Sequence, residues 1–448
     1  MKRSIIHRPG SRGRRVVAVA IAVLLAAVAA NMPAMIRAVA GPKPSVRGGD
    51  GVVPGITVLL EDSVRLIRGK RVGLLTNQTG VDRSGTSDIV LLSRSPLARQ
   101  AGVQLAVLFS PEHGIRGQDD REFVPGGMDT ASRIPVYSLY GATVLAPPDS
   151  ILRRIDVLVI DLQDVGTRTW TYVASVLYAM RAAARTHVPV LVLDRPNPIT
   201  GTRTEGPMLA SGLADPDESA PGRPARPYAL APIPLRHGLT MGELARYYND
   251  DLRVGADLHV IPARGWRRAS WFDETGLLWV KPSPNLPSLT SALLYPALVA
   301  FEGSNVSVGR GTPEAFQRLG APWLDAPRVV ALLGARRLPG VRFDTGTFVP
   351  VAPGDGKFKG QAIPGVRILV TDRSQVETGR VGATLLWALA AANADSLRLD
   401  TLAFDLRFGD PAARAALVHG ADPDRTMAAM APAIAAFAHR VEPYLLYR

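Results

Sequence analysis

The sequence predicts an α/β fold in which a doubly wound parallel sheet is followed by a second, smaller α+β domain. Three apolar runs, at 107–109, 157–160 and 190–193, have the length of strands, and each ends abruptly in polar residues. Apolar runs of this kind are typical of strands that helices cover on both faces. Segments with helical spacing separate the runs, and this alternation favours a parallel sheet between two layers of helices.

The elements of the first domain follow in chain order. Strands are expected at 71–77, 103–109, 157–160, 190–193 and 259–262. Helices are expected from 88, at 169–186, where apolar residues recur along one side, and from 240. The helix from 240 opens with a capping-box pattern, because Thr240 and Glu243 can bond each other's backbone N–H groups.

The second domain follows two irregular segments. Residues 205–234 are rich in Pro, Gly, Ala and Asp and too long for an ordinary connection, so we expect a surface insertion or a lid. The proline-rich stretch 281–287 predicts a rigid, extended crossing near the domain boundary. Beyond it we expect a strand at 366–370 and helices at 291–301, at 327–333, from 381 and from 427.

The first forty residues have the composition of an export signal. Basic residues precede an unbroken apolar run at 16–30, and no acidic residue occurs before Asp50. The run is short for a membrane-spanning helix, and small residues near Ala30 and Ala40 offer cleavage sites. We therefore expect an exported, periplasmic or extracellular protein that meets the membrane only through this segment, if it is not cleaved.

The composition limits the partners of the mature chain. Residues 1–40 hold seven basic and no acidic residues, so their removal lowers the formal charge from +13 to +6. The remaining excess suits a polyanion such as a cell wall but is not gathered into runs that would suggest nucleic acid. Cys is absent, and the seven His residues show no metal-ligand spacing. We expect no metal ion and no cofactor.

Polar residues follow the predicted strands at the point where each strand ends. Because the carboxyl ends of parallel strands meet at one edge of a sheet, these residues should share a rim. The rim set comprises Glu112, His113, Asp161, Asp164, Arg168, Asp194, Arg195 and Asn197. Acids, guanidinium groups and an imidazole in one cleft suit acid–base chemistry on a polar substrate.

Glycoside hydrolysis is one reaction that such a rim could support. It requires a carboxylic acid that protonates the leaving oxygen and a second group that manages water or the sugar cation. Glu112 fits the first role, although it could instead accept backbone N–H bonds in a turn. The second group stays open among Asp161, Asp164, Asp194, Glu205 and Glu302. The Gly-rich segment 302–312 could bring Arg310 to an anion.

Eight motifs carry a resemblance to a known family. They are GLLTNQTG (73–80), SPEHGIRG (110–117), DLQDVGTRTWTY (161–172), LDRPNPITG (193–201), EGPML (205–209), SPNLPS (283–288), FEGSNVSVGRGT (301–312) and GAPW (320–323). From Ile56 onwards the chain resembles the NamZ-like exo-β-N-acetylmuramidases, a family of bacterial glycoside hydrolases. The composition predicts a signal peptide at 1–40 and a linker at 41–55. The resemblance implies a Rossmann-like catalytic domain, which we place at 56–280, and an auxiliary α+β domain, which we place at 285–448.

The resemblance also implies an activity, a site in the cleft between the two domains and a catalytic role for Glu112. The activity is release of N-acetylmuramic acid from the non-reducing end of peptidoglycan-derived MurNAc-GlcNAc glycans, in cell-wall turnover or recycling. The expected catalytic residues are Glu112, His113 and Asp164. The expected substrate-binding residues are Asn77, Arg116, Asp161, Arg168, Tyr172, Arg195, Asn197, Glu205, Asn285, Glu302 and Arg310. Two alternatives stay open: a non-catalytic muropeptide-binding protein, and a metal-dependent amidase or deacetylase.

Overall fold

The computed structural model describes residues 51–118, 125–141, 145–215, 217 and 226–448. The predicted signal peptide and most of the predicted linker lie outside these residues. The chain from Gly48 to Arg448 is one compact unit. Within the described ranges, no helix combines the length and the apolar character that a membrane span needs.

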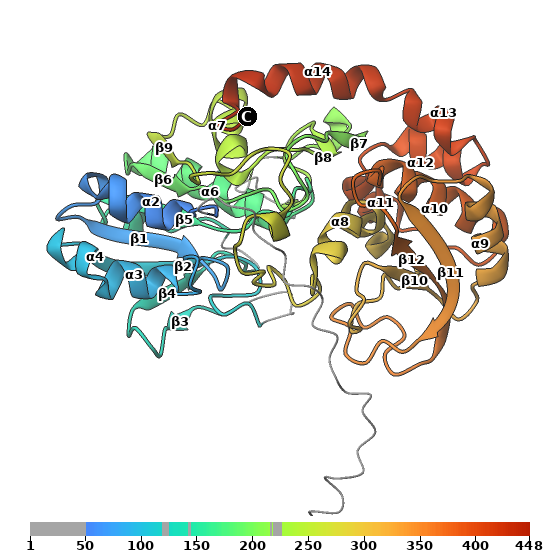
Figure 1. The fold of residues 1–448 in the computed structure, drawn as a ribbon, viewed down its shortest axis with the longest axis horizontal. Helices are drawn as coiled ribbons and strands as arrows, with labels where there is room; N and C mark the ends of the chain where they lie inside the picture. Colours follow the sequence, from blue (N-terminus) through green and yellow to red (C-terminus); the bar gives the residue numbers. More distant parts are fainter. Residues whose placement is uncertain (1–50, 119–124, 142–144, 216, 218–225) are drawn as a thin grey trace, which may run out of the picture. The chain divides into compact units, whose positions relative to one another are not determined.

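The first domain is built on a seven-stranded sheet in the order β3-β4-β2-β1-β5-β6-β9 (Figure 1). The strands are β1 (Arg71–Thr76), β2 (Gln104–Ser110), β3 (Gly127–Met128), β4 (Pro135–Ser138), β5 (Val157–Asp161), β6 (Val190–Leu193) and β9 (Leu258–Ile261). All neighbouring pairs are parallel except β3 and β4. Because β2 and β5 lie on opposite sides of β1, the chain reverses its winding there, which confirms the doubly wound sheet.

Helices cover both faces of this sheet. They are α2 (Gly55–Asp62), α3 (Asp88–Arg94), α4 (Pro96–Gln100), α5 (Asp149–Leu152), α6 (Thr171–Thr186) and α7 (Met241–Asp251). Alternate strand residues point to opposite faces. Val157 and Val159 pack with α2 and α3, whereas Leu158 and Ile160 pack with α6 and α7. The predicted capping box at Thr240 and Glu243 is confirmed at the start of α7.

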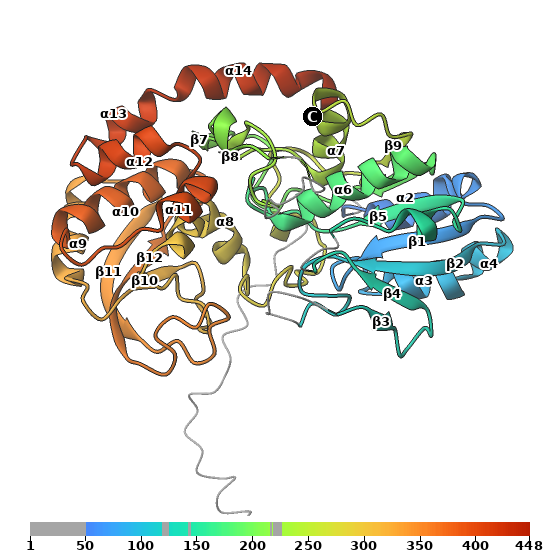
Figure 2. The same ribbon diagram turned by 180° about the vertical axis from the view of Figure 1, so that it is seen from behind.

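The second domain holds a three-stranded antiparallel sheet and a set of helices, as expected for a smaller α+β domain (Figure 2). Its strands, in sheet order, are β10 (Arg318–Gly320), β12 (Ile363–Val370) and β11 (Val341–Phe348). Its helices are α8 (Leu289–Leu298), α9 (Ala326–Ala335), α10 (Thr378–Ala392), α11 (Thr401–Phe408), α12 (Pro411–Val418), α13 (Pro423–Ala428) and α14 (Ala431–Val441). Short 3-10 turns occur in both domains, and they are η1 (Val64–Leu66), η2 (Ser211–Leu213), η3 (Phe272–Glu274), η4 (Val299–Gly303) and η5 (Glu442–Tyr444).

The segment 205–234 is more regular than expected. Its ends contribute β7 (Glu205–Met208) and β8 (Pro234–Arg236), which pair as an antiparallel ribbon. Leu209 and Ala229 are buried against Leu406 of the second domain. The ends of this segment are therefore part of the packed body, because apolar residues among its prolines and glycines find a surface to bury. Residues 216 and 218–225, in the middle of the predicted lid, lie outside the described residues.

Helix α14 and the residues after it connect the second domain back to the first. Figure 1 shows α14 running from α13 towards α7. The rings of Phe437 and Tyr444 lie 5.9 and 5.5 Å from the ring of Tyr247 in α7. The Tyr447 hydroxyl donates a 2.6 Å hydrogen bond to Asp194, which follows β6. The second domain is thus attached to the first at both of its ends.

Candidate functional site

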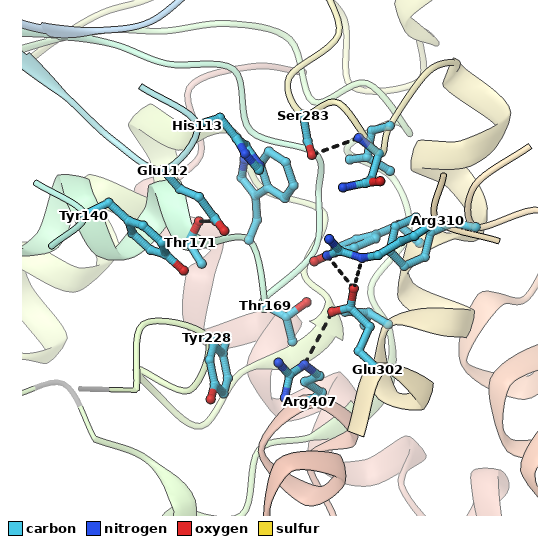
Figure 3. Close-up of a pocket in the computed structure, with 16 residues that line it drawn as sticks. Glu112, His113, Tyr140, Thr169, Thr171, Tyr228, Ser283, Glu302, Arg310 and Arg407 are labelled. Atoms are coloured by element: carbon cyan, nitrogen blue, oxygen red, sulfur yellow. Dashed lines mark hydrogen bonds and ion pairs between the residues drawn. The ribbon is translucent and has the colours of Figure 1, made fainter. Parts of the chain in front are cut away.

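A pocket lies between the loop after β2, the start of α6 and the second domain (Figure 3). We call it the Glu112 pocket. Its lining residues are Glu112, His113, Tyr140, Thr169, Trp170, Thr171, Tyr228, Ser283, Asn285, Leu286, Tyr295, Val299, Glu302, Arg310, Phe316 and Arg407. Five of these were expected from the sequence: Glu112, His113, Asn285, Glu302 and Arg310.

Glu112 reaches the pocket from a tight turn directly after β2. His113 has a backbone φ of 68°, and Gly114 has a φ of 72°. The N–H of Gly114 donates to the carbonyl of Pro111 over 3.1 Å, which closes the turn. A left-handed conformation at a residue other than glycine is energetically costly, and such residues gather at functional sites. This turn is what directs the carboxylate of Glu112 out of the buried strand.

Two hydroxyl groups lie against the Glu112 carboxylate (Figure 3). The hydroxyl of Thr171, the first residue of α6, donates to Glu112 Oε2 over 2.5 Å. Tyr140 is the second neighbour, and its pKa is raised by burial and by the adjacent charge of Glu112. Tyr140 therefore stays protonated and can act as a hydrogen-bond donor at neutral pH. Both hydroxyls restrict the orientation of Glu112.

The opposite wall of the pocket carries arginines around one carboxylate. Arg310 Nε donates to Glu302 Oε1 over 2.7 Å, and Arg407 Nε lies 3.5 Å from Glu302 Oε2. Burial opposes ionisation of Glu302, but the charges of Arg310 and Arg407 outweigh it and hold its pKa below the ordinary value. Lys357 adds a third positive charge behind the wall, where its ammonium group donates to the carbonyl of Glu302 over 3.0 Å. This side of the pocket can accept an anion.

Several expected substrate-binding residues do not line the pocket. At the ends of β5 and β6, Asp161 and Arg195 form a buried ion pair, and Arg195 also donates to the carbonyl of Val81 over 2.8 Å. Asn197 donates to the carbonyl of Leu239 over 2.8 Å. The carboxyl edge at the centre of the sheet is therefore filled by the chain's own side chains. Asp161 and Arg195 do meet at the predicted rim, but of the residues at these strand ends only Glu112 and His113, after β2, line the Glu112 pocket.

Other expected residues also have partners within the protein. Tyr172 donates to the carbonyl of Pro282 over 2.6 Å. Asn77 accepts a 2.9 Å bond from the N–H of Thr79. Arg116 forms an ion pair with Asp129, and Glu205 forms one with Arg236 over 2.6 Å. A sequence motif identifies such polar residues but does not distinguish substrate contacts from internal hydrogen bonds.

Asp164, expected to be catalytic, also lies outside the pocket lining. It accepts a 2.7 Å bond from the N–H of Gly166, and His237 Nε2 lies 3.5 Å from the same oxygen. Burial raises the pKa of Asp164 to about 7. Burial and the charges of nearby arginines lower the pKa of His237 to about 3. The pair is a buried polar contact, and neither residue lines the Glu112 pocket.

The structure adds residues that the sequence did not indicate. Tyr140, Tyr228 and Arg407 line the pocket, yet none of them belongs to a motif that marks a site. Thr171 lies inside the motif 161–172, but a threonine in a motif carries no chemical signal by itself. Among the described residues, no group of three or more His, Asp or Glu side chains is arranged to hold a metal ion.

Comparisons with known proteins agree across most of the chain. A sequence model described as Exo-beta-N-acetylmuramidase NamZ, N-terminal, matches residues 72–290, and the corresponding C-terminal model matches residues 293–447. The peptidoglycan beta-N-acetylmuramidase NamZ of Bacillus subtilis (strain 168) is 37% identical over 398 residues, which cover 88% of this chain and 91% of that protein.

Two solved structures share the fold. A crystal structure of a DUF1343 family protein from Bacteroides fragilis NCTC 9343 matches with a TM-score of 0.78 and 31% identity, over 90% of this chain and 100% of that one. A second DUF1343 family protein from the same organism matches with a TM-score of 0.68 and 26% identity, over 89% and 99%. Together, the two family models and the bacterial relative show that this chain belongs to the exo-β-N-acetylmuramidase NamZ family.

Proposed function

We propose that this protein is an exo-acting glycosidase that releases N-acetylmuramic acid from the non-reducing end of peptidoglycan-derived glycans. Membership of the family makes the chain a glycosidase of peptidoglycan processing. One observation carries the finer proposal. A carboxylate held by two hydroxyl neighbours, Glu112, lies in the same pocket as a wall that bears Arg310 and Arg407.

Glu112 supplies the proton chemistry in this proposal. As general acid it protonates the glycosidic oxygen while the bond to the sugar breaks. The hydroxyls of Thr171 and Tyr140 hold its carboxyl group in one orientation, which favours transfer to a single position. Glu302 is engaged by Arg310 and Arg407, so we assign it to the arginine wall rather than to proton transfer.

The arginine wall supplies selectivity for muramic acid. N-acetylmuramic acid differs from N-acetylglucosamine by its lactyl group, which ends in a carboxylate. An anion that leaves water for a partly buried pocket needs a positive partner. Arg310 is our first candidate for that partner, because it faces the pocket from the Gly-rich segment 302–312.

Two further features complete the proposal. Exo action requires that the glycan end inside the pocket, and we assign the closing wall to Tyr228, which lines the pocket. Export to the periplasm or the cell exterior rests on the sequence of residues 1–40. The substrates are then wall fragments released in turnover or recycling.

The proposal is tested by the Glu112→Gln variant on the MurNAc-GlcNAc disaccharide. The amide keeps the shape of the side chain but has no proton to transfer, so we expect turnover to fall by about 100- to 10,000-fold. The affinity for the disaccharide, measured by calorimetry, should be nearly unchanged. Glu61→Gln, on the exposed face of α2, is the matched control and should keep wild-type turnover.

The results also separate the alternatives. Release of N-acetylmuramic acid by Glu112→Gln at the wild-type rate would remove Glu112 from the acid role. A wild-type protein that binds the disaccharide without cleaving it would instead be a muropeptide-binding protein. Cleavage in the interior of intact glycan strands would contradict exo action.

A further inference from the structure

Arg407 reaches the Glu112 pocket from the second domain. It lies near the end of α11, and its guanidinium carbon is 4.5 Å from the centre of the Tyr228 ring. Its Nη1 donates to the carbonyl of Ala403 over 3.0 Å, which fixes the side chain along its own helix. Figure 3 shows the guanidinium group between Tyr228 and Glu302. Arg407 is therefore oriented on two sides before any ligand binds.

Arg310 and Arg407 differ in how closely they approach Glu302. Arg310 Nε approaches Glu302 to 2.7 Å, whereas Arg407 Nε stays 3.5 Å from the other carboxylate oxygen. A charged N–H···O bond is ordinarily about 2.7–2.9 Å long, so Arg407 is the more weakly neutralised of the two. Two guanidinium groups share the Glu302 carboxylate, and the longer contact of Arg407 makes its guanidinium group the one we expect to meet a second anion.

Arg168, in the first domain, forms hydrogen bonds with the main chain of both Arg407 and Tyr228. Its side chain is only 2% exposed, and its guanidinium group donates to three main-chain carbonyls. They belong to Arg407 over 2.8 Å, Leu406 over 3.0 Å and Tyr228 over 3.2 Å. Burial lowers the pKa of Arg168 to about 10, so it remains a cation at neutral pH.

The close approach of α11 to Arg168 depends on Gly409, the residue after the helix. Gly409 has a φ of 115°, a conformation that side chains with a Cβ rarely adopt. A Cβ at this position would lie 2.7 Å from the carbonyl oxygen of Met208 and 3.0 Å from Arg168 Nη2. The end of α11 is thus built to fit around this guanidinium group.

We propose that Arg407 is a second specificity-determining arginine for the carboxylate of the substrate, and that Arg168 is the positioning residue that holds Arg407 and Tyr228 at the pocket across the two domains. The proposal rests on the proposed function, since it assumes a sugar acid in the Glu112 pocket. It replaces the expected direct contact between Arg168 and substrate with an indirect role.

The first test compares two substrates that differ only in charge. They are an aryl β-glycoside of N-acetylmuramic acid and the same glycoside with the lactyl carboxylate converted to a carboxamide. Arg407→Gln should raise KM for the acid by at least about tenfold and leave KM for the amide within about twofold. Arg342→Gln, an exposed arginine of β11, is the matched control and should change neither value. Equal losses on both substrates would overturn the role of Arg407.

The second test is a double-mutant cycle with Arg168→Lys. If Arg168 acts through Arg407, Arg168→Lys should reduce the preference for the acid over the amide in the wild-type background. It should reduce it no further in Arg407→Gln, because coupled residues are not additive. An equal reduction in both backgrounds would overturn the positioning role. Where Arg168→Lys does not fold, as judged by circular dichroism, Gly409→Ala displaces the same helix end and takes its place in the cycle.

A binding measurement separates this proposal from the proposed function. Free N-acetylmuramic acid and N-acetylglucosamine are titrated by calorimetry into the wild type and Arg407→Gln, which requires no turnover. If the wild type binds N-acetylmuramic acid more tightly than N-acetylglucosamine and the variant does not, the result supports Arg310 and Arg407 as partners of the carboxylate. This holds even if no glycosidase activity is detected. Equal affinities for both sugars in the wild type would overturn the role of Arg310 and Arg407 in binding the carboxylate. The proposed glycosidase activity would not be contradicted by that result.

Discussion

Asp164 places a carboxyl group where water is excluded. Its folded-state pKa of about 7 lies above the ordinary value of 3.8, because burial penalises the ionised form. The folded state therefore holds this proton more tightly than the unfolded state does. Its contribution to stability is present below about pH 4 and is lost as the pH rises through 7.

We predict that Asp164→Asn changes the pH dependence of stability. The amide oxygen can still accept the bond from Gly166, but the side chain cannot ionise. The melting temperature of the variant relative to the wild type should therefore improve between pH 5 and pH 8. Thermal unfolding at both pH values measures this, and a difference that does not change with pH would contradict the assignment.

At the scale of elements, helix α10 packs on the ribbon β7–β8 through a contact between two glycines. A Cβ on Gly379, in the first turn of α10, would lie only 2.5 Å from the Cα of Gly206 in β7. Gly334, inside α9, has open space around the same position. The two glycines thus offer the same substitution in opposite surroundings.

Gly379→Ala should destabilise the protein by about 1–3 kcal/mol, because the extra methyl group forces helix and ribbon apart. Gly334→Ala should stabilise it by about 0.5–1 kcal/mol, since alanine is the better helix former. Denaturant unfolding of both variants gives the comparison. Changes of the same sign would mean that the contact between α10 and β7 adjusts freely.

Local sequence patterns predicted some strands and helices and missed others. The strands β5 and β6, nearly all of β1 and the second half of β2 are buried on both faces, so their apolar runs made them predictable. Strand β11 was missed because most of its residues are exposed and polar, and helix α14 begins at Ala431, after the separate helix α13. An exposed strand is stabilised by hydrogen bonds to the neighbouring strand in its sheet. The local sequence does not show which segment that neighbour will be.

Some residues of the candidate site could also be predicted from the sequence, and others could not. Glu112 was predictable because it follows a buried strand, and Arg310 because it lies in a polar, Gly-rich segment. Arg407 was not, since an arginine on an ordinary helix resembles any surface cation until the fold brings it to Glu302. Asp161 and Arg195 were expected to bind substrate but do not line the Glu112 pocket, and their mutual ion pair lies at the sheet edge.

At the scale of the whole molecule, Tyr447 links the far end of the second domain to the sheet of the first. Its hydroxyl donates to Asp194 and accepts a 2.9 Å bond from the N–H of Ala263. Tyr447→Phe leaves both partners buried without this hydroxyl, so we expect a loss of about 1–3 kcal/mol in the free energy of unfolding. Tyr444→Phe removes an exposed hydroxyl that bonds Asp250, and it should cost less than about 1 kcal/mol. Denaturant titration compares them, and equal losses would contradict a structural role for Tyr447.

The bond between Tyr447 and Asp194 also bears on the order of events in folding. Its partners are 253 positions apart in the sequence, so the ribosome completes β6 long before the residue that caps it exists. Contacts of high sequence separation require the loop between their partners to be closed, and proteins rich in such contacts fold more slowly. Asp194 can accept bonds from Thr240 and Gly242 within the first domain, but it lacks the third bond until Tyr447 has been made. The hydrogen bonding of Asp194 is therefore complete only when Tyr447 has docked on the first domain.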